Sequence, residues 1–174
     1  MRVVPIRDAT ATDADACARI YAPYVDDTAI SFEVEAPGPV EMAERIADAQ
    51  RRHAWLVAEE EGAVLGYAYG GTWKARPAYR WTCEVSVYLH PDARGRGLGR
   101  ALYDELFDRL VERGMLVAVA GITLPNDPSI ALHGALGFTE VGVFSGVGYK
   151  HGAWRDVGWY RRTLAEPPAT GPAV

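Results

Sequence analysis

The feature that most limits how this chain can fold is a glycine-rich turn, Arg94–Gly99, between two runs of opposite periodicity. The run before it, Trp81–Leu89, is apolar and typical of a β-strand, whereas the leucines after it recur at helical spacing and end near Gly114. Glycines let the backbone approach a ligand closely, and the free N–H groups at the start of a helix favour an anion. We therefore expect a strand–turn–helix unit that can cradle phosphate.

Three arginines surround this turn: Arg94, Arg96 and Arg100. Guanidinium groups bind phosphate oxygens in bidentate fashion, which strengthens the expectation of a phosphate ligand. The turn lacks the Gly-Lys-Ser/Thr of a P-loop, and its third glycine falls one residue early for the dinucleotide fingerprint. A second interpretation stays open, in which the glycines only turn a solvated loop. By itself the turn predicts a ligand that carries polyphosphate.

The remaining runs predict the order of the other elements. They are a strand at Val3–Arg7, helices that begin after Thr12 and at Pro39, a hairpin of Trp55–Glu59 and Val64–Trp73, a strand at Leu116–Leu124 buried on both faces, a short helix at Ser129–Leu136 with Gly137 just after it, and strands at Phe138–Phe144 and Val157–Leu164. This order predicts a mixed α/β fold in one domain, residues 1–164. A Pro-, Ala- and Gly-rich tail, residues 165–174, is expected to be flexible.

Composition excludes several classes of protein. A formal charge of −5 argues against a general nucleic-acid binder, and no apolar run approaches the ~20 residues of a membrane span. The first residues show no apolar segment of a cleavable signal. Cys17 and Cys83 are too few for a disulfide framework or a zinc site, so we expect a cytoplasmic protein without a metal. Of 18 basic residues only Lys74 and Lys150 are lysines.

Four blocks of sequence resemble one enzyme family. Arg94-x-x-Gly97-x-Gly99 after an apolar strand is similar to the pyrophosphate loop of the GNAT acyltransferases. The blocks Trp73–Trp81, Asn126–Ser129 and Lys150–Gly158 resemble the phosphinothricin N-acetyltransferase branch, and the likeness covers about Ile6–Leu164. The resemblance implies an acetyl-CoA-dependent N-acetyltransferase with a mixed, mostly antiparallel sheet, splayed between its fourth and fifth strands and flanked by helices.

The resemblance also implies where acetyl-CoA binds. The pantetheine chain would lie in the splay against the fourth strand, and the pyrophosphate on the glycine-rich turn. The implied cofactor residues are Val87, Tyr88, Leu89, Arg94, Gly95, Arg96, Gly97, Leu98, Gly99, Arg100, Asn126 and Ser129. Asn126 and Ser129 are equally open to interpretation as residues that begin the following helix.

Amine acetylation requires a group that removes a proton from the acceptor ammonium. Glu84 lies in an otherwise apolar strand, on the same face as Ser86, and the resemblance implies that it is this base. The residues alone also allow a glutamate on the solvated face of an edge strand. His133 stands where many GNAT enzymes have a tyrosine that protonates the departing thiolate. An imidazole can act as acid or within a base relay, and a structural role stays open.

The resembled branch acetylates phosphinothricin, methionine sulfoximine and methionine sulfone, by direct transfer to the α-amino group and usually as a homodimer. Basic groups beside aromatic rings suit such polar acceptors. The implied acceptor residues are Phe32, Trp73, Lys74, Arg76, Tyr79, Glu84, Val85, Ser86 and Lys150. The alternatives are surface ion pairs beside core aromatics, another acceptor such as a polyamine, aminoglycoside or protein amine, and a non-catalytic acyl-CoA-binding module. The basic side chains would repel a cationic acceptor.

Overall fold

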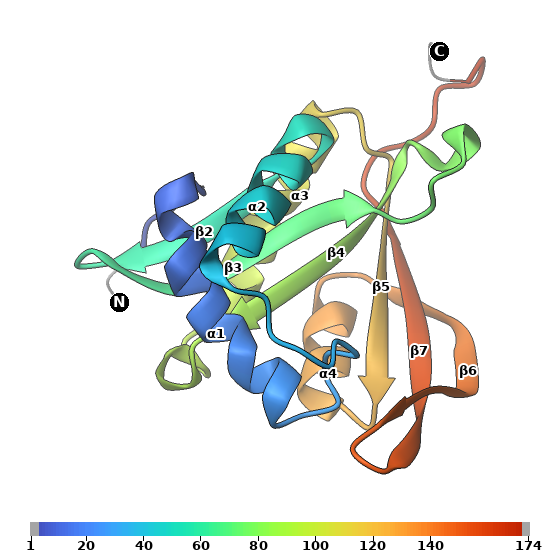
Figure 1. Ribbon diagram of the computed structural model, residues 1–174. Helices are drawn as coiled ribbons and strands as arrows, with labels where there is room; N and C mark the ends of the chain where they lie inside the picture. Colours follow the sequence, from blue (N-terminus) through green and yellow to red (C-terminus); the bar gives the residue numbers. More distant parts are fainter. Residues whose placement is uncertain (1–3, 172–174) are drawn as a thin grey trace.

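The computed structural model describes residues 4–171, which form a central seven-stranded sheet in the order β1-β2-β3-β4-β5-β7-β6 (Figure 1). The strands are β1 Ile6–Asp8, β2 Trp55–Glu60, β3 Ala63–Thr72, β4 Thr82–Leu89, β5 Val117–Leu124, β6 Thr139–Lys150 and β7 Ala153–Thr163. Neighbouring strands are antiparallel except β4 and β5, which are parallel. The expected mixed, mostly antiparallel sheet is confirmed.

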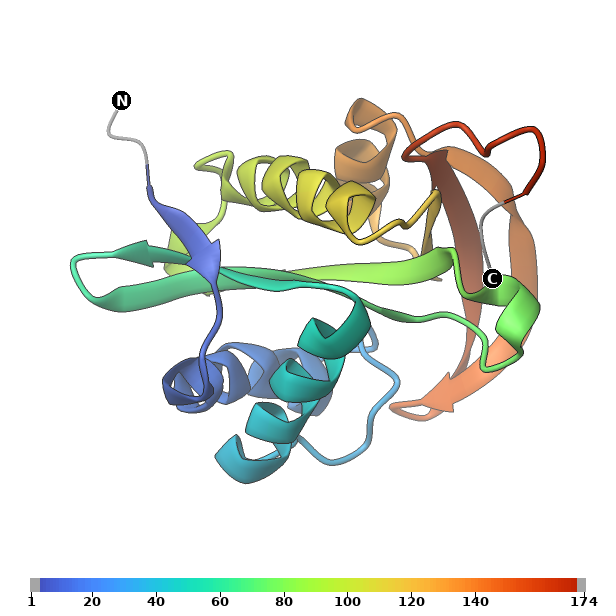
Figure 2. The ribbon, with the colours of Figure 1, turned by 90° about the horizontal axis from the view of Figure 1, so that it is seen from above.

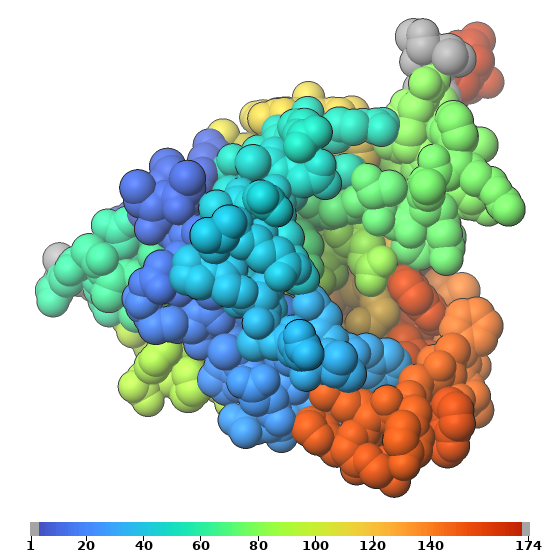
Figure 3. Space-filling model, viewed as in Figure 1, coloured from blue at the N-terminus to red at the C-terminus, as the bar shows by residue number. Residues whose placement is uncertain are grey.

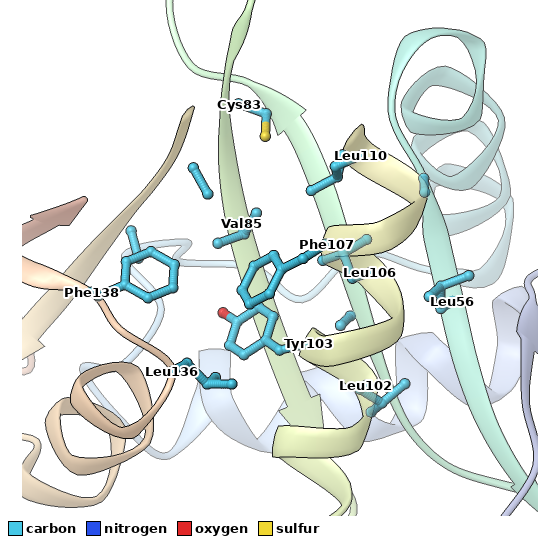
Figure 4. Packing of buried hydrophobic residues seen from close by; sticks show 14 of the residues in the cluster. Leu56, Cys83, Val85, Leu102, Tyr103, Leu106, Phe107, Leu110, Leu136 and Phe138 are labelled. Carbon is cyan, nitrogen blue, oxygen red and sulfur yellow. The ribbon is translucent and has the colours of Figure 1, made fainter. Parts of the chain in front are cut away.

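Helices cover both faces of the sheet, as the view from above shows (Figure 2). On one face lie α1, Ala14–Asp26, and α2, Pro39–Arg52; on the other lie α3, Leu98–Glu112, and α4, Asp127–Ala135. Each face has its own apolar core. The α3 side is centred on the leucines of that helix with Tyr103 and Phe107 (Figure 4), and the α1–α2 side on Tyr67 and Trp55. Side chains of successive strand residues therefore alternate between two buried layers.

The two halves of the sheet separate between β4 and β5. These strands pair only where Thr82–Glu84 lies beside Val117–Val119. Beyond Glu84, β4 stays with β3, whereas β5 stays with β7 along its whole length. The second half of β4 therefore faces an opening, and the splay expected from the family resemblance is confirmed.

Several boundaries differ from the expected ones. The strand expected from Val3 begins at Ile6; residues 1–3, like residues 172–174 of the expected tail, lie outside the described part. The first helix is not capped at Thr12, because a short 3-10 helix, Ala11–Asp13, precedes it. The Asp13 carboxylate accepts the Thr10 amide hydrogen at 2.7 Å and also binds the guanidinium of Arg7, which fixes this entry turn.

The closing hairpin is longer than the sequence suggests. The strands expected at Phe138–Phe144 and Val157–Leu164 instead extend to Lys150 and start at Ala153. The glycines of β6 interrupt the apolar–polar alternation by which a strand is recognised in the sequence. The register of β6 against β7 also shifts between Phe144 and Gly148. By contrast, Ala118–Ala120 of β5 is buried without a break, but Gly121 is exposed and the ends are half-buried, so the burial expected for all of Leu116–Leu124 is confirmed only in part.

Two further features agree with local chemistry. Gly137 follows α4 with a φ of 81°, the left-handed conformation expected of a glycine that ends a helix. Among residues 4–171, no helix has the length and apolar character needed to cross a bilayer.

Candidate active site

A groove of about 440 Å³ runs from the open edge of β4 to the start of α3. It joins the splayed strand, the glycine-rich turn and the first turn of α4. Its walls are Tyr24, Ile30, Val87, Leu89, Arg94, Gly95, Gly97, Leu98, Gly99, Arg100, Asn126, Pro128, Ser129 and Leu132. Most of the residues expected to hold the cofactor therefore lie along one surface.

The glycine-rich turn has the backbone of an anion cradle. Gly95 and Gly97 have φ values of 72° and 78°, and Gly97 is the residue that precedes the first turn of α3. Side chains rarely adopt this conformation, so glycine is needed here to aim the following N–H groups into the groove. The dipole of α3 adds partial positive charge at the same end.

The three arginines at the turn have different partners. Arg94 donates to the Tyr24 hydroxyl at 3.0 Å and stays on the groove wall. Arg100 also lines the groove, and its Nε atom lies 3.6 Å from a carboxylate oxygen of Asp104. Arg96 instead donates to both oxygens of Glu60 at 3.0 Å. The Arg96 side chain therefore points to Glu60 and does not line the groove in this structure, and its role in cofactor binding stays a prediction.

Asn126 holds the start of α4 as well as facing the groove. Its side-chain oxygen accepts the Ser129 amide hydrogen at 3.3 Å, which satisfies a free donor of the first helical turn. Both residues also line the groove. The two interpretations that the sequence left open are thus compatible.

A smaller hollow of about 60 Å³ lies deeper in the splay, between β4 and β5. His133 of α4 and Tyr103 of α3 both face it, and both are buried. His133 Nδ1 is 2.8 Å from the Ser129 carbonyl, which can only accept, so this nitrogen carries the proton. Nε2 lies 3.2 Å from the Tyr103 hydroxyl and is left to accept from it. Burial lowers the pKa of His133, so the imidazole is neutral at neutral pH.

Glu84 stands at the point where the splay begins. Glu84 is the last residue of β4 that pairs with β5. Its neighbour Val85 packs against α3, so the alternation of side chains along a strand places Glu84 on the opposite face, the one covered by α1 and α2. Burial raises the pKa of its carboxyl, and the charge of Lys74 partly offsets this. Glu84 and His133 therefore border the opening from the two faces of the sheet.

Three of the expected acceptor residues come together on the β3–β4 connection. Lys74, Arg76 and Tyr79 line a pocket of about 320 Å³ together with Arg52 and other residues. The Lys74 ammonium lies 5.4 Å from the centre of the Trp73 ring. In the space-filling view, a recess is bounded by this connection (green), by the segment between α1 and α2 (blue), and by the β6–β7 hairpin (orange) (Figure 3). This pocket shares no lining residue with the groove or the deeper hollow, and Lys74 is the cation whose charge acts on the Glu84 carboxyl.

Lys150 does not join this group. Its ammonium is buried, 6% exposed, and donates to the carbonyls of Val25 at 2.5 Å and Ser31 at 2.7 Å. The expectation that it presents a free charge to the acceptor is therefore wrong, because both bonds tie it to the end of α1 and the segment after it. Phe32 lies in that same segment and packs against Gly148.

Among residues 4–171, no group of three or more metal-ligating side chains is found.

Comparison with known proteins shows which family the chain belongs to. Residues 18–138 match the model of the acetyltransferase (GNAT) family. The chain belongs to the GNAT family. It is an N-acetyltransferase by this membership, and the expected resemblance is confirmed.

Relatives of this GNAT enzyme share nearly its whole length. It is 44% identical to phosphinothricin N-acetyltransferase of Streptomyces viridochromogenes, over 98% of this chain and 93% of the relative. It is 38% identical to the L-methionine sulfoximine/L-methionine sulfone acetyltransferase of Salmonella typhimurium, over 94% and 96%. The crystal structure of a phosphinothricin acetyltransferase from Sinorhizobium meliloti in complex with acetyl-CoA superposes with a TM-score of 0.93, at 39% identity, over 99% of this chain and 94% of that one.

Two tyrosines are among the residues of the GNAT site that were not expected from the sequence. Tyr103 resembles an ordinary core residue of an amphipathic helix, yet its hydroxyl faces the hollow beside His133. Tyr24 joins the groove because its hydroxyl donates to the Leu89 carbonyl at 2.7 Å and accepts from Arg94. No local sequence signal marks either residue, because both depend on contacts distant in the chain.

Proposed function

We propose that this GNAT enzyme transfers the acetyl group of acetyl-CoA directly to the α-amino group of a small amino acid with an anionic or strongly polar side chain. One observation carries the proposal: the splay opens immediately after Glu84 and continues into the phosphate cradle. The relatives named for phosphinothricin and for methionine sulfoximine and sulfone support the same acceptor class.

The groove fits the cofactor on physical grounds. The left-handed Gly95 and Gly97, the N–H groups that follow them and the side chains of Arg94 and Arg100 suit the pyrophosphate. The backbone of Val87–Leu89 borders the splay, where an extended pantetheine arm would lie as an added strand, a mode that uses unpaired main-chain groups. When bound, acetyl-CoA supplies an activated thioester.

Glu84 is proposed as the general base. An amine is protonated at neutral pH and becomes nucleophilic only after it loses a proton. Burial raises the pKa of Glu84, which makes its carboxylate a better proton acceptor than an exposed one. Its place on the α1–α2 face matches an acceptor that enters through the recess of Figure 3.

His133 and Tyr103 are proposed as a proton relay on the other face. Because Nδ1 already donates to the Ser129 carbonyl, neutral His133 has only an acceptor, Nε2, to offer. A proton released by the acceptor nitrogen reaches the Tyr103 oxygen while the Tyr103 hydrogen passes to His133 Nε2, and the reverse path returns that proton to the departing CoA thiolate. The neutral Tyr103–His133 pair must therefore take up a proton before it can donate one.

The charges of Lys74 and Arg76 favour an anionic acceptor over a polyamine or aminoglycoside. A thiol-release assay with acetyl-CoA tests this with phosphinothricin, methionine sulfoximine, methionine sulfone, ordinary amino acids and spermidine. We expect turnover with the first three and none with spermidine. Arg76→Met should raise the KM for phosphinothricin without raising that for acetyl-CoA. Turnover confined to cationic acceptors would refute the proposal, and acetyl-CoA binding without any turnover would favour a binding module.

A homodimer is proposed from the surface of the β6–β7 hairpin. Large exposed apolar side chains gather there: Val141, Val143, Phe144, Val147, Tyr149 and Trp154. Several large exposed apolar side chains on an edge hairpin are typical of a protein interface, and a second copy of the chain is the partner that symmetry favours. Light scattering should give a dimer for the native chain and a monomer for Val143→Glu. Val40→Glu, at an apolar position 77% exposed on α2, should remain dimeric.

We also propose a cytoplasmic location. The free, buried thiols of Cys17 and Cys83 suit a reducing compartment. Fractionation of cells that produce the tagged chain tests this, and recovery with the membrane or secreted fraction would contradict it.

A further inference from the structure

The segment between α1 and α2, residues 27–38, passes across the mouth of the splay. Ile30 lines both the groove and the deeper hollow, and Phe32 is 40% exposed on the same segment. In Figure 3 this blue segment meets the orange β6–β7 hairpin below the recess. The position of residues 27–38 therefore sets the width of the opening on the α1–α2 face.

Lys150, at the end of β6, fastens this segment to the hairpin. Its buried ammonium donates to the carbonyl of Val25 in the last turn of α1 and to that of Ser31 within the segment. The Thr28 hydroxyl donates to the neighbouring carbonyl of Tyr24 at 2.6 Å, so Lys150 and Thr28 together satisfy two of the free carbonyls at the end of α1. A cation there is also favoured by the helix dipole, and Asp26 and Glu33 are the carboxylates whose charge acts on it.

The same hairpin makes two other contacts with the segment. His151 Nε2 lies 3.1 Å from the carbonyl of Thr28. At Gly148, a Cβ atom would lie only 2.2 Å from the Phe32 ring, so glycine is what allows this ring to sit against β6. On the opposite side, Glu33 is held by Arg45 at 2.7 Å. The segment is thus clamped between the hairpin and α2.

We propose that Lys150 is a positioning residue that holds residues 27–38 as a wall of the acceptor site, without touching the acceptor itself. The inference rests on the proposed function in one respect, that the acceptor enters on the α1–α2 face. A buried ammonium that loses its carbonyl partners is strongly unfavourable, so the charge and the two carbonyls hold one another in place. Removing the charge releases the end of α1 and lets Ile30 and Phe32 leave the opening.

The test uses Lys150→Met, which keeps the length of the side chain but removes the ammonium. Arg19→Met is the matched control, because Arg19 is an exposed cation on α1, the helix whose end Lys150 binds, and it forms an ion pair with Asp15. We expect Lys150→Met to raise the acceptor KM about tenfold, the effect of losing charge-assisted hydrogen bonds, with kcat changed much less. Amide hydrogen exchange of residues 27–38 should become faster in Lys150→Met and stay unchanged in Arg19→Met.

A second variant approaches the same segment from another contact. Gly148→Ala displaces the Phe32 ring while leaving the ammonium intact, and it should also raise the acceptor KM and speed exchange of residues 27–38. If Lys150→Met does not fold, Gly148→Ala alone tests whether residues 27–38 form a wall of the acceptor site.

Two results would overturn the inference. An acceptor KM that rises in Lys150→Met while exchange of residues 27–38 stays native would mean that Lys150 contacts the acceptor directly. Native KM and native exchange would mean that the clamp has no role. If the enzyme acetylates none of the acceptors, the proposed function fails, whereas hydrogen exchange still measures whether Lys150 holds the segment.

Discussion

Replacing Glu84 by glutamine removes the proposed base while keeping the size of the side chain. Glu84 occupies the last β4 position that pairs with β5, and it is not among the residues that line the acetyl-CoA groove. The substitution should therefore alter proton removal and leave cofactor binding intact. This separation makes it the most informative single change in the molecule.

The expected loss follows from what a positioned base contributes. General-base catalysis is worth about 10²–10⁴ in rate, which corresponds to roughly 2.7–5.5 kcal/mol of activation free energy. We expect kcat to fall by that factor in a thiol-release assay at saturating acetyl-CoA, with the Kd for acetyl-CoA, measured by calorimetry, changed less than about twofold. Glu105→Gln, which affects an i,i+4 ion pair with Arg109 on α3 outside the groove, serves as the control.

The raised pKa of Glu84 adds a test of pH dependence. The acid limb of kcat/KM should titrate above 4.5, the ordinary glutamate value, and disappear in Glu84→Gln. A carboxyl whose folded pKa is raised stabilises the fold at low pH, and this contribution is lost as pH rises through that pKa. At about pH 8, Glu84→Gln should therefore unfold at the same temperature as the native chain or higher. Unchanged kcat, or a clear loss of stability at that pH, would refute the role.

Three further changes test other parts of the site. Gly97→Ala puts a side chain on a residue in the left-handed conformation, which costs about 1–2 kcal/mol, and calorimetry should show acetyl-CoA binding weakened about tenfold. The control is Gly114→Ala, at a φ of 82° beyond the far end of α3, which should lower the unfolding temperature only. The lowered pKa of His133 gives stability that is present above pH 6.5 and is lost as the pH falls through the pKa of the folded state. The unfolding temperature should therefore drop less between about pH 7.5 and 5.5 in His133→Gln than in the native chain. An equal drop in both would contradict the neutral, buried state of His133. Tyr103→Phe removes the partner of His133 Nε2 and should lower kcat about tenfold at unchanged acetyl-CoA affinity; native kcat would exclude the relay.

The sequence predicts well those features that local chemistry determines. The bounds of α2 follow from a proline at its first position and arginines at its last turn, and the glycine-rich turn lies between β4 and α3 as expected. Only the family resemblance predicts the splay, since strand pattern alone does not say where two parallel strands separate.

Contacts between distant segments explain what the sequence could not predict. Lys150 looks like a free cation, but its carbonyl partners belong to the end of α1 and to the segment after it, more than a hundred residues earlier. Arg96 turns to Glu60, a residue of another strand, and Tyr103 becomes a site residue only because α4 places His133 beside it. Charge and hydropathy patterns do not contain these pairings.

The central claim is that acetyl-CoA in the splay acetylates a small amino-acid acceptor beside Glu84 in one step. The most direct measurement is the initial rate of N-acetyl-methionine sulfoximine formation, followed by mass spectrometry while both substrates are varied. Direct transfer within a ternary complex requires intersecting double-reciprocal lines, and we expect these lines together with formation of the α-N-acetyl product. Parallel lines, which indicate a covalent acetyl-enzyme, or the absence of that product would contradict it.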